Sequence, residues 1–418
     1  MPKTAIDKYL THYAEPEIGG LQQISSRYQY ALVVPICNES TDCLKTICQA
    51  IKTQHLLIIA IVNSPTPHEN RRIWQKNNQQ WIQSLLKNST NHLKINARTT
   101  LLNCPNFHDV LLIDRNSFGN QIACKQGVGL ARKIGADCAL KLFQLDKIKQ
   151  PWIFSTDADV SLPKNYFELE LSKFTANSAI VLDFVHHSTD AHMKKLQFLY
   201  DFKMRYYLAG IVYAGSGYQY IPLGSTVIIA MTSYAQVRGF PKKNAAEDFY
   251  LLNKLNKTKA IHYNIQNCRI TIQSRFSNRV VFGTGPALTA IVALEKPMDY
   301  PFYHPNCFIM LKQWLQFLSS LWQEKLIITP PQETLLAELY HHLNCHIVFN
   351  KSKPQITSQQ RWTQFVHQWF DAFRTLKAIH FFHKKFKPLT IQQLLNHPSF
   401  AKVNNLSLQT FLENLWLN

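Results

Sequence analysis

The amino-acid sequence predicts an α/β protein in which a mostly parallel central sheet is flanked by helices and followed by a helical C-terminal region. Five short apolar runs rich in β-branched residues lie in the first 300 residues, and helical patterns separate them. Apolar runs that do not alternate with polar residues are typical of strands buried on both faces of a parallel sheet. After residue 300 amphipathic stretches replace these runs. We therefore expect an α/β domain over 1–300 and a helical region over 301–418 that packs on it.

The predicted strands end in polar residues. The five runs are Ala31–Ile36, Leu57–Val62, Val110–Ile113, Trp152–Phe154 and Ala179–Phe184. Asn38 and Glu39 follow the first run, Asn63 follows the second, and Asp157 and Asp159 follow the fourth. Because ligands bind beyond the carboxyl ends of the strands in such sheets, we expect the functional residues there.

Predicted helices alternate with the strands and then dominate the C-terminal region. Within the α/β domain the examples are Thr41–Lys52 and Arg71–Leu86. The C-terminal stretches are Phe308–Trp322, Glu333–Leu343, Gln359–Phe382 and Leu389–Leu395. Their apolar faces predict that they are buried, either on the α/β domain or within a small second domain.

The composition is that of an ordinary globular protein with a large positive charge. Forty-five Lys and Arg residues against 26 Asp and Glu residues give a net charge of +19, and 12% of the residues are aromatic, which excludes disorder along the whole chain. The charge favours anionic partners such as nucleotide diphosphates, phospholipid surfaces or nucleic acid. A general basic bias explains it equally well, so charge alone does not select a function.

Cysteine usage and hydropathy indicate a cytoplasmic protein. The nine cysteines form no CxxC pair, so neither a disulfide framework nor a structural zinc site is predicted. The first 17 residues contain no apolar stretch, and we expect no signal peptide. Apolar runs are too short to cross a bilayer. We expect the chain in the cytoplasm, either soluble or peripheral at the inner membrane face.

Asp157 and Asp159 are candidate ligands of a divalent cation. The two carboxylates are two residues apart and leave a buried strand together. Magnesium or manganese is commonly held by one or two carboxylates and by substrate phosphates. The alternative is a polar turn that caps the next helix.

Gly127 and Gly129 open a predicted helix that carries Arg132 and Lys133 in its first turns. Exposed N-terminal amides beside two cations predict an anion site. The spacing is neither a dinucleotide fingerprint nor a P-loop, because Arg132 stands at the third glycine position and no GK[ST] follows. The alternative is an ordinary helix start with a solvated basic face.

Glu247 and Asp248 begin another predicted helix, after Gly224-Ser225-Thr226 and the strand Val227–Met231. Carboxylates in a first helical turn stabilise the helix dipole. A carboxylate at the edge of a cleft also serves as a general base.

Two cationic segments complete the candidates. Arg275 and Arg279 are four residues apart and precede a Gly-Thr-Gly turn, which predicts an anion clamp or, alternatively, a surface loop. Residues 380–389 (HFFHKKFKPL) mix aromatic and cationic side chains in a way that suits a membrane or a nucleic acid. For this second segment we favour an ordinary helix end.

The order and spacing of these motifs resemble a bacterial family 2 glycosyltransferase with the GT-A fold, of a subgroup of uncertain substrate. The resemblance covers roughly residues 28–300, and its most specific parts are STDAD (155–159) and the Glu-Asp pair within RGFPKKNAAEDFYLLNKL (238–255).

The resemblance implies a role for each candidate. Asn38 and Glu39 lie by the nucleotide of the donor, and Arg132 faces its base or diphosphate. Asp157 and Asp159 address the metal and the sugar-diphosphate. Asp248 is implied as the base, with Glu247 beside it. Arg275 and Arg279 are implied to bind the donor, and His262 is implied as a third metal ligand. Asn63 stands where the family often has an aspartate for the nucleobase, which leaves the choice of base open.

The expected function is therefore transfer of a sugar from a nucleotide-sugar donor to an unidentified acceptor hydroxyl, inverting and dependent on Mn²⁺ or Mg²⁺. Peripheral contact with an anionic membrane is an open alternative, weaker than packing of the C-terminal region on the α/β domain, and we expect no nucleic-acid partner. Two alternatives remain open. A nucleotidyltransferase is disfavoured because no Gly-rich basic loop follows the first strand. A non-enzymatic basic protein would bind membranes or nucleic acid through its charge.

Overall fold

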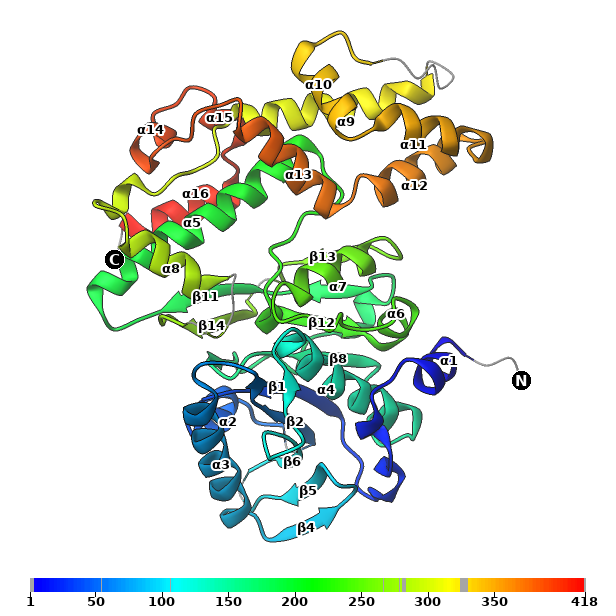
Figure 1. Cartoon of the computed structure of the whole chain (residues 1–418), viewed down its shortest axis with the longest axis vertical. Coiled ribbons are helices and arrows are strands. Elements are labelled where there is room, and N and C mark those ends of the chain that lie inside the picture. The colour runs from blue at the N-terminus through cyan, green and yellow to red at the C-terminus, as the bar shows by residue number, and fades with distance from the viewer. Residues whose placement is uncertain are drawn as a thin grey trace. The chain divides into compact units, whose positions relative to one another are not determined.

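The computed structural model describes residues 4–53, 55–105, 107–265, 267–277, 279, 283–323 and 330–416. The chain divides into a sheet unit, Met1–Asp190 with Pro222–Pro286, and a helical unit, Ala191–Ile221 with Ala287–Asn418. The predicted α/β architecture with a large central sheet and a helical C-terminal region is confirmed (Figure 1). The boundary predicted at residue 300 differs from this division, because residues 191–221 group with the C-terminal helices.

A nine-stranded sheet forms the centre of the sheet unit, in the order β13-β10-β12-β8-β1-β2-β6-β5-β4. The central strands β8, β1, β2 and β6 are parallel, and antiparallel pairs flank them on both sides. The strands are β1 (Tyr30–Ile36), β2 (Leu56–Asn63), β4 (Asn91–Lys94), β5 (Thr99–Asn103), β6 (Asp109–Arg115), β8 (Trp152–Ser155), β10 (Ala179–Val181), β12 (Val227–Ala230) and β13 (Ile261–Tyr263). The first four predicted strands match β1, β2, β6 and β8, and these strands are almost entirely buried.

Strand β1 lies at the topological switch point of the sheet. From β1 the chain moves outward to β2 and β6, and it then returns to place β8 on the other side of β1. Connections on opposite sides of such a point leave a crevice beyond the carboxyl ends of the two strands. In this chain the corresponding position, where a ligand is expected, lies between the segments that follow Ile36 and Ser155.

Helix α4 (Gly127–Gln144) packs against β1, β2 and β8, and α3 (Arg71–Lys87) lies on the other side of the sheet (Figure 1). The close approach of α4 depends on Gly135, because a Cβ there would lie 2.4 Å from Val33 and 2.6 Å from Ile61. The other helices of this unit are α1 (Ala5–His12), α2 (Cys43–Cys48), α6 (Met231–Gln236) and α7 (Glu247–Asn256).

A buried polar network fastens α1 to α4. The Lys133 ammonium donates to the hydroxyl of Tyr9 at 2.6 Å and to Asp137 at 2.8 Å. The hydroxyls of Tyr9 and Tyr234 both donate to Asp137. The predicted solvated basic face of this helix is therefore absent at Arg132 and Lys133, both of which are buried.

Two small sheets lie beside the large one. One is three-stranded and contains β9 (Val160–Ser161), β11 (Asp183–His187) and β14 (Arg269–Gln273). The other is two-stranded and contains β3 (Pro65–Thr66) and β7 (Ile122–Ala123). The fifth predicted strand, Ala179–Phe184, is divided between two sheets. Ala179–Val181 pairs in the large sheet as β10, and Asp183 begins β11 of the three-stranded sheet.

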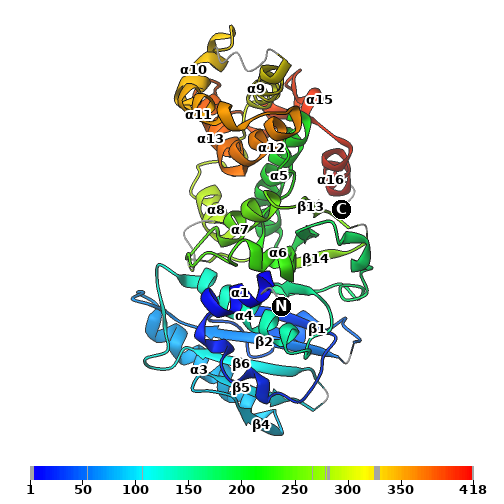
Figure 2. The same ribbon diagram turned by 90° about the vertical axis from the view of Figure 1, so that its right-hand side faces the viewer.

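In the helical unit, α5 (Ala191–Ala214) packs against α9 (Asn306–Gln323), α15 (Phe400–Val403) and α16 (Leu406–Trp416). Helix α9 also packs against α12 (Gln359–Trp369) and α13 (Ala372–His383) (Figure 2). Helix α5 was not predicted. The predicted helix Gln359–Phe382 is two helices, α12 (Gln359–Trp369) and α13 (Ala372–His383), because Asp371 caps a new helix by accepting a hydrogen bond from Arg374 N–H. The remaining helices are α8 (Thr284–Val292), α10 (Thr334–His342), α11 (Cys345–Ser352) and α14 (Ile391–Leu395).

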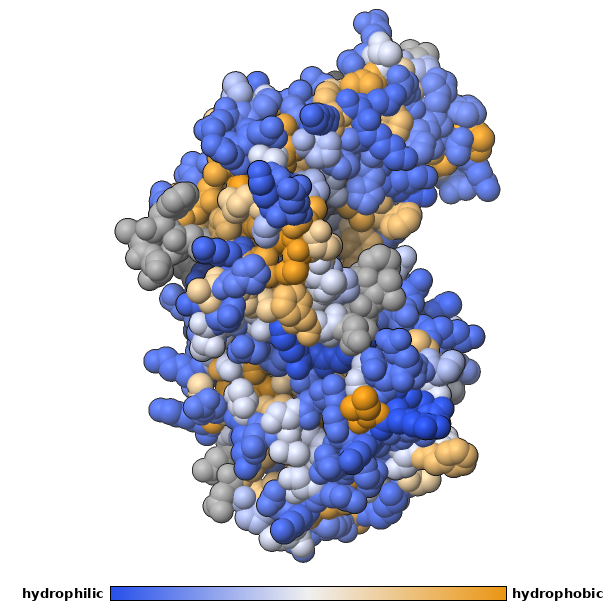
Figure 3. All heavy atoms as spheres, turned by 60° about the vertical axis from the view of Figure 1, so that its left-hand side comes forward, coloured by the Kyte–Doolittle hydropathy of each residue, from blue (hydrophilic) through white to orange (hydrophobic). Residues whose placement is uncertain are grey.

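Apolar side chains are concentrated in the interior of each unit. On the face shown in Figure 3 most of the surface is hydrophilic, and the apolar residues form separate patches. Within the described ranges, no helix has the length and hydropathy needed to cross a membrane.

A fragment ending at residue 300 tests the assignment of α5 to the helical unit. Phe202 and Tyr206 of α5 contact Phe302 and Phe308, and the Phe308 ring lies against Gly210. The fragment keeps α5 and removes these partners, so fully buried aromatic rings become exposed, each worth about 1.5–3 kcal/mol of burial. We expect the 1–300 fragment to be insoluble, or to elute as aggregates in size-exclusion chromatography. A matched fragment, 1–190 joined to 222–286 by a Gly/Ser linker, should stay soluble, and a monomeric, folded 1–300 fragment would contradict the assignment.

Candidate active site

The Arg132 guanidinium joins two carboxylates from different parts of the chain. Arg132 lies in the second turn of α4 and is 2% exposed. Its Nη2 atom pairs with Asp157 Oδ1 at 2.5 Å, and its Nε atom pairs with Glu247 Oε1 at 2.9 Å. We call Arg132, Asp157 and Glu247 the Arg132 cluster. It links the segment after β8 to the first residue of α7.

The third nitrogen of Arg132 fixes the surrounding backbone. Nη1 donates to Ser155 Oγ at 3.0 Å, to the Gly224 carbonyl at 3.1 Å and to the Thr156 carbonyl at 3.4 Å. A Cβ at residue 224 would lie 2.3 Å from Nη2, so glycine is required there. All three guanidinium nitrogens are thus engaged inside the protein, and Arg132 fixes the backbone and side chains around it.

A second set of charges lies at the same sheet edge. Arg275 pairs with both oxygens of Glu39, at 2.8 and 2.6 Å, and also with Asp159 at 2.8 Å. Arg279 donates to Glu39 and to the Cys37 carbonyl. We call Glu39, Asp159, Arg275 and Arg279 the Glu39 cluster. The sequence-predicted clamp of two arginines therefore reaches the end of β1 and the end of β8.

The pKa values of Glu39 and Asp159 are shifted in opposite directions, because the guanidiniums outweigh burial at Glu39 but not at Asp159. Burial would raise the pKa of Glu39, but the two guanidiniums outweigh it and hold the pKa below its ordinary value. Burial and the neighbouring Asp157 raise the pKa of Asp159 against the effect of Arg275. Asp157 and Asp159 remain 37% and 21% exposed, so both are accessible to a ligand.

The pKa of Asp248 is shifted toward neutrality. Burial and the negative charge of the adjacent Glu247 raise the pKa of Asp248 to about 7, although Arg132 opposes the shift. The residue before this pair, Ala246, has φ 59° and ψ 21°, the left-handed region that non-glycine residues rarely occupy. Backbone strain of this kind is concentrated at functional sites.

An amide network fixes the end of β1. The Asn78 side chain accepts from Asn38 N–H at 2.8 Å and donates to the Asn63 carbonyl at 2.9 Å. Asn63 is 4% exposed and donates to the Ile36 carbonyl at 3.1 Å, so its amide ties β2 to β1. Asn77 donates to Asn38 Oδ1 at 2.7 Å. Asn38, with φ 56°, is thereby held at the sheet edge beside Glu39.

His262 is the one predicted site residue that the structure does not bring to this edge. It lies in the edge strand β13, and its ring centre is 4.6 Å from that of Phe174. Two strands, β10 and β12, separate β13 from β8. At about 4.8 Å per strand, His262 is roughly 14 Å from the β8 backbone.

The predicted anion site at the N-terminus of α4 is also not formed. The Gly129 N–H donates to the Lys243 carbonyl at 2.9 Å. A Cβ at Gly127 would meet Asn244 at 2.7 Å, and one at Gly129 would meet the Pro241 carbonyl at 2.4 Å. The glycines are needed because the backbone of 241–244 covers this helix end.

The charge balance of the site fits a divalent cation. The two clusters and Asp248 together contain five carboxyl groups and three guanidinium groups. Over the described ranges, no group of three or more His, Cys, Asp and Glu side chains is arranged to hold a metal ion. Asp157 and Asp159 nevertheless fit the usual magnesium arrangement, in which one or two carboxylates act with substrate phosphates.

Sequence reasoning missed several residues that hydrogen-bond to Arg132 and Asn38 and fix their positions. Ser155 binds Arg132, and Asn77 and Asn78 on α3 bind Asn38. The available signal was a pair of adjacent asparagines, Asn77 and Asn78, in the middle of a predicted amphipathic helix.

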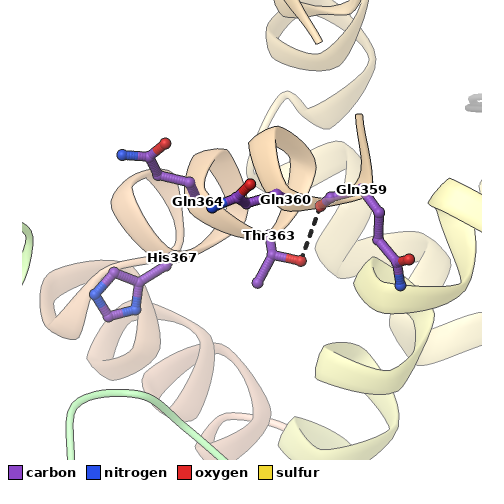
Figure 4. Close-up of a pocket in the computed structure, with 5 residues that line it drawn as sticks. All are labelled: Gln359, Gln360, Thr363, Gln364 and His367. Atoms are coloured by element: carbon purple, nitrogen blue, oxygen red, sulfur yellow. Dashed lines mark hydrogen bonds between the residues drawn. The ribbon is translucent and has the colours of Figure 1, made fainter. Parts of the chain in front are cut away.

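A separate pocket of 740 Å³ lies along α12 in the helical unit (Figure 4). Its described lining residues are Gln359, Gln360, Thr363, Gln364 and His367. The glutamines and the threonine are solvent-exposed, and the Thr363 hydroxyl donates to the Gln359 carbonyl. This pocket has no carboxylate or guanidinium in its described lining, and we assign it no part in the chemistry.

Comparison with known proteins gave matches among solved structures. No family model matches the sequence, and a search of the curated proteins found no match. One similar structure is Staphylococcus aureus TarS, residues 1–349, in complex with UDP-GlcNAc, with 13% identity, a TM-score of 0.33, and coverage of 93% of this chain and 92% of that chain. Another is the mannosyltransferase PcManGT from Pyrobaculum calidifontis in complex with GDP-Man and Mn²⁺, with 10% identity, a TM-score of 0.36, and coverage of 87% and 92%. Likenesses this distant carry no argument about function.

Replacing Arg132 by Met tests its positioning role. The change leaves Glu247 buried without its cation, and loss of one partner of a buried ion pair costs about 3–5 kcal/mol. Arg27→Met is the control, because Arg27 and its partner Asp146 are 72% and 82% exposed, and such surface pairs contribute about 0.2–1 kcal/mol. Urea unfolding measures both free energies. Equal losses in the two variants would show that Arg132 does not organise the site.

Proposed function

We propose that this chain is a glycosyltransferase that moves a sugar from a nucleotide-sugar donor to an acceptor hydroxyl, with inversion and with a divalent cation. The observation that carries the proposal is the pair of ion clusters at the switch point. Carboxylates from the end of β8 and from the start of α7 share one buried arginine, so candidate donor ligands and a candidate base are held in one site.

In this proposal the donor diphosphate binds at Asp157 and Asp159. When bound there, Mn²⁺ or Mg²⁺ would neutralise charge on the departing diphosphate. Arg275 and Arg279 contact Asp159 or Glu39 and provide two further cations at the same edge. Cationic groups placed where negative charge develops lower the barrier, because they need no reorganisation during the reaction.

Asp248 is the proposed base. It takes the proton of the acceptor hydroxyl, whose oxygen forms a bond to the anomeric carbon of the sugar. The bond from that carbon to the diphosphate oxygen breaks on the opposite face, and its electron pair leaves with the diphosphate. A base with a pKa near 7 is well matched to this step at neutral pH.

The nucleoside is proposed to lie beyond β1, near Asn38. The Asn63 amide donates to backbone carbonyls and is buried, so it does not serve as a reader of the base. Asn38 and Asn77 are only half-buried and offer amide groups at this edge.

Asp159→Asn tests the donor site. The variant keeps the shape of the side chain and removes a charge, so the affinity for UDP or GDP with Mn²⁺ should fall by about tenfold or more. Asp42→Asn is the control, because Asp42 also follows β1 but is 67% exposed in a surface pair with Lys45. Calorimetry on the full chain measures binding. Equal nucleotide affinities in wild type, Asp159→Asn and Asp42→Asn would refute the site.

Asp248→Asn tests the base. Turnover, followed as release of the nucleoside diphosphate, should fall by about 10²–10⁴-fold while donor affinity is kept. In the wild type, activity should rise as the pH increases through about 7, because only the deprotonated carboxylate accepts the proton. Asp146→Asn, at an 82% exposed side chain, should leave turnover unchanged. Turnover of Asp248→Asn within a few-fold of wild type would exclude this residue as the base.

A further inference from the structure

A group of cationic and aromatic side chains lies in the helical unit, apart from the residues proposed for catalysis. We call it the Lys203 cluster, and its members are Lys203 on α5, Tyr300 and Tyr303 in the segment before α9, and His380 and His383 on α13. The Lys203 ammonium is 4.3 Å from the centre of the Tyr300 ring and 6.0 Å from that of Tyr303. The two histidines are three residues apart, which places them on one face of their helix.

Tyr303 lies at the centre of the cluster. Its hydroxyl is 3.0 Å from His380 Nε2, and its ring centre is 5.0 Å from that of His383. The Tyr303 carbonyl accepts a hydrogen bond from Tyr206, which fixes the backbone of this segment. Three elements thus hold an ammonium, a phenol and two imidazoles in one place.

Lys203 has no countercharge. Among the described residues, none forms a hydrogen bond or an ion pair with its ammonium, and no carboxylate acts on it. Burial lowers the pKa of Lys203 to about 8, and burial together with the charge of Lys203 lowers the pKa values of His380 and His383. Lys203 is half-buried, and charges that are withdrawn from water are normally paired, because their desolvation is costly. This cluster has donors and positive charge but lacks an anion.

We propose that the Lys203 cluster binds a phosphate group. A tetrahedral oxyanion would accept hydrogen bonds from the Lys203 ammonium, the Tyr303 hydroxyl and the imidazole N–H groups. The phosphate belongs to a soluble phosphate ester or to a phospholipid headgroup. The exposed residue Lys384, which follows His383, adds positive charge at the same helix end, whereas the neighbouring Lys385 is ion-paired with Glu338 at 2.6 Å.

The competing explanation is that Lys203 only packs on Tyr300. If Lys203 only packs on Tyr300, an uncharged side chain of similar length should replace it without loss of anion binding. Lys203→Met therefore distinguishes a packing role from an anion-binding role. Lys312→Met is the matched control, because the Lys312 ammonium on α9 lies 4.4 Å from the ring centre of Tyr213 on α5, a cation–π contact of the same kind outside the cluster.

The experiment is calorimetric titration of the full chain with inorganic phosphate and with sulfate. We expect saturable binding that Lys203→Met weakens by about tenfold or more, since a charge-assisted hydrogen bond is lost, and that Lys312→Met leaves unchanged. Equal anion affinity in wild type and Lys203→Met would overturn the proposal. The proposal would also be overturned if the chain bound neither anion and no vesicles. A similar loss in Lys312→Met would overturn it too, because the effect would then be one of net charge.

Vesicles of phosphatidylcholine with and without phosphatidylglycerol distinguish the two sources. Sedimentation that requires the anionic lipid, is reduced by Lys203→Met and is inhibited by free phosphate supports a headgroup. Anion binding without sedimentation supports a soluble ester.

Sulfate also tests the charge of the cluster, because its own charge is constant between about pH 6.5 and about pH 9.5. The groups that face the anion are Lys203 from α5, Tyr300 and Tyr303 from the segment before α9, His380 and His383 from α13, and Lys384 directly after α13. Sulfate affinity should fall as the pH rises through about 8 and Lys203 loses its proton. Affinity that is independent of pH over this range would contradict the assignment.

Discussion

The site depends on one buried guanidinium. Arg132 bonds to Asp157, Glu247, a serine hydroxyl and two backbone carbonyls, so a single side chain fixes the end of β8, the loop at Gly224 and the start of α7. Burying an arginine requires this many partners, because each unmet donor would be costly. The buried network of Lys133 and Asp137 holds the same helix against α1 and so supports the position of Arg132.

The same constraint produces the chemical contrast within the site. Glu247 forms an ion pair with Arg132, whereas Asp248, the next residue, has no such pair among the described residues, and its pKa is raised to about 7. A carboxyl whose environment moves its pKa toward neutrality is a common basis for acid–base chemistry. In the Glu39 cluster, Arg275 likewise compensates Glu39 and Asp159. The site therefore combines fixed charges with one carboxyl that titrates near neutrality.

Much of this arrangement followed from local patterns in the sequence. Unalternated apolar runs predicted β1, β2, β6 and β8, and the polar residues after them included Glu39, Asp157 and Asp159. Long-range contacts were not predictable: no local signal showed that Arg132 faces inward, that Gly127 and Gly129 serve packing against 241–244, or that His262 lies in an edge strand. Helix α5 was missed because its apolar residues are spread around the helix, and it packs on α9, about 100 residues later in the chain.

The most direct test of the central claim is thermal unfolding of the full chain with a panel of nucleotide-sugars, each with Mn²⁺, with Mg²⁺ and with a chelator. A donor present at about 100 times its dissociation constant stabilises the folded protein by about 2.7 kcal/mol. The account predicts that one class of nucleotide-sugar raises the melting temperature by a few degrees, and that the chelator abolishes the effect. No stabilisation by any nucleotide-sugar, with either metal, would contradict it.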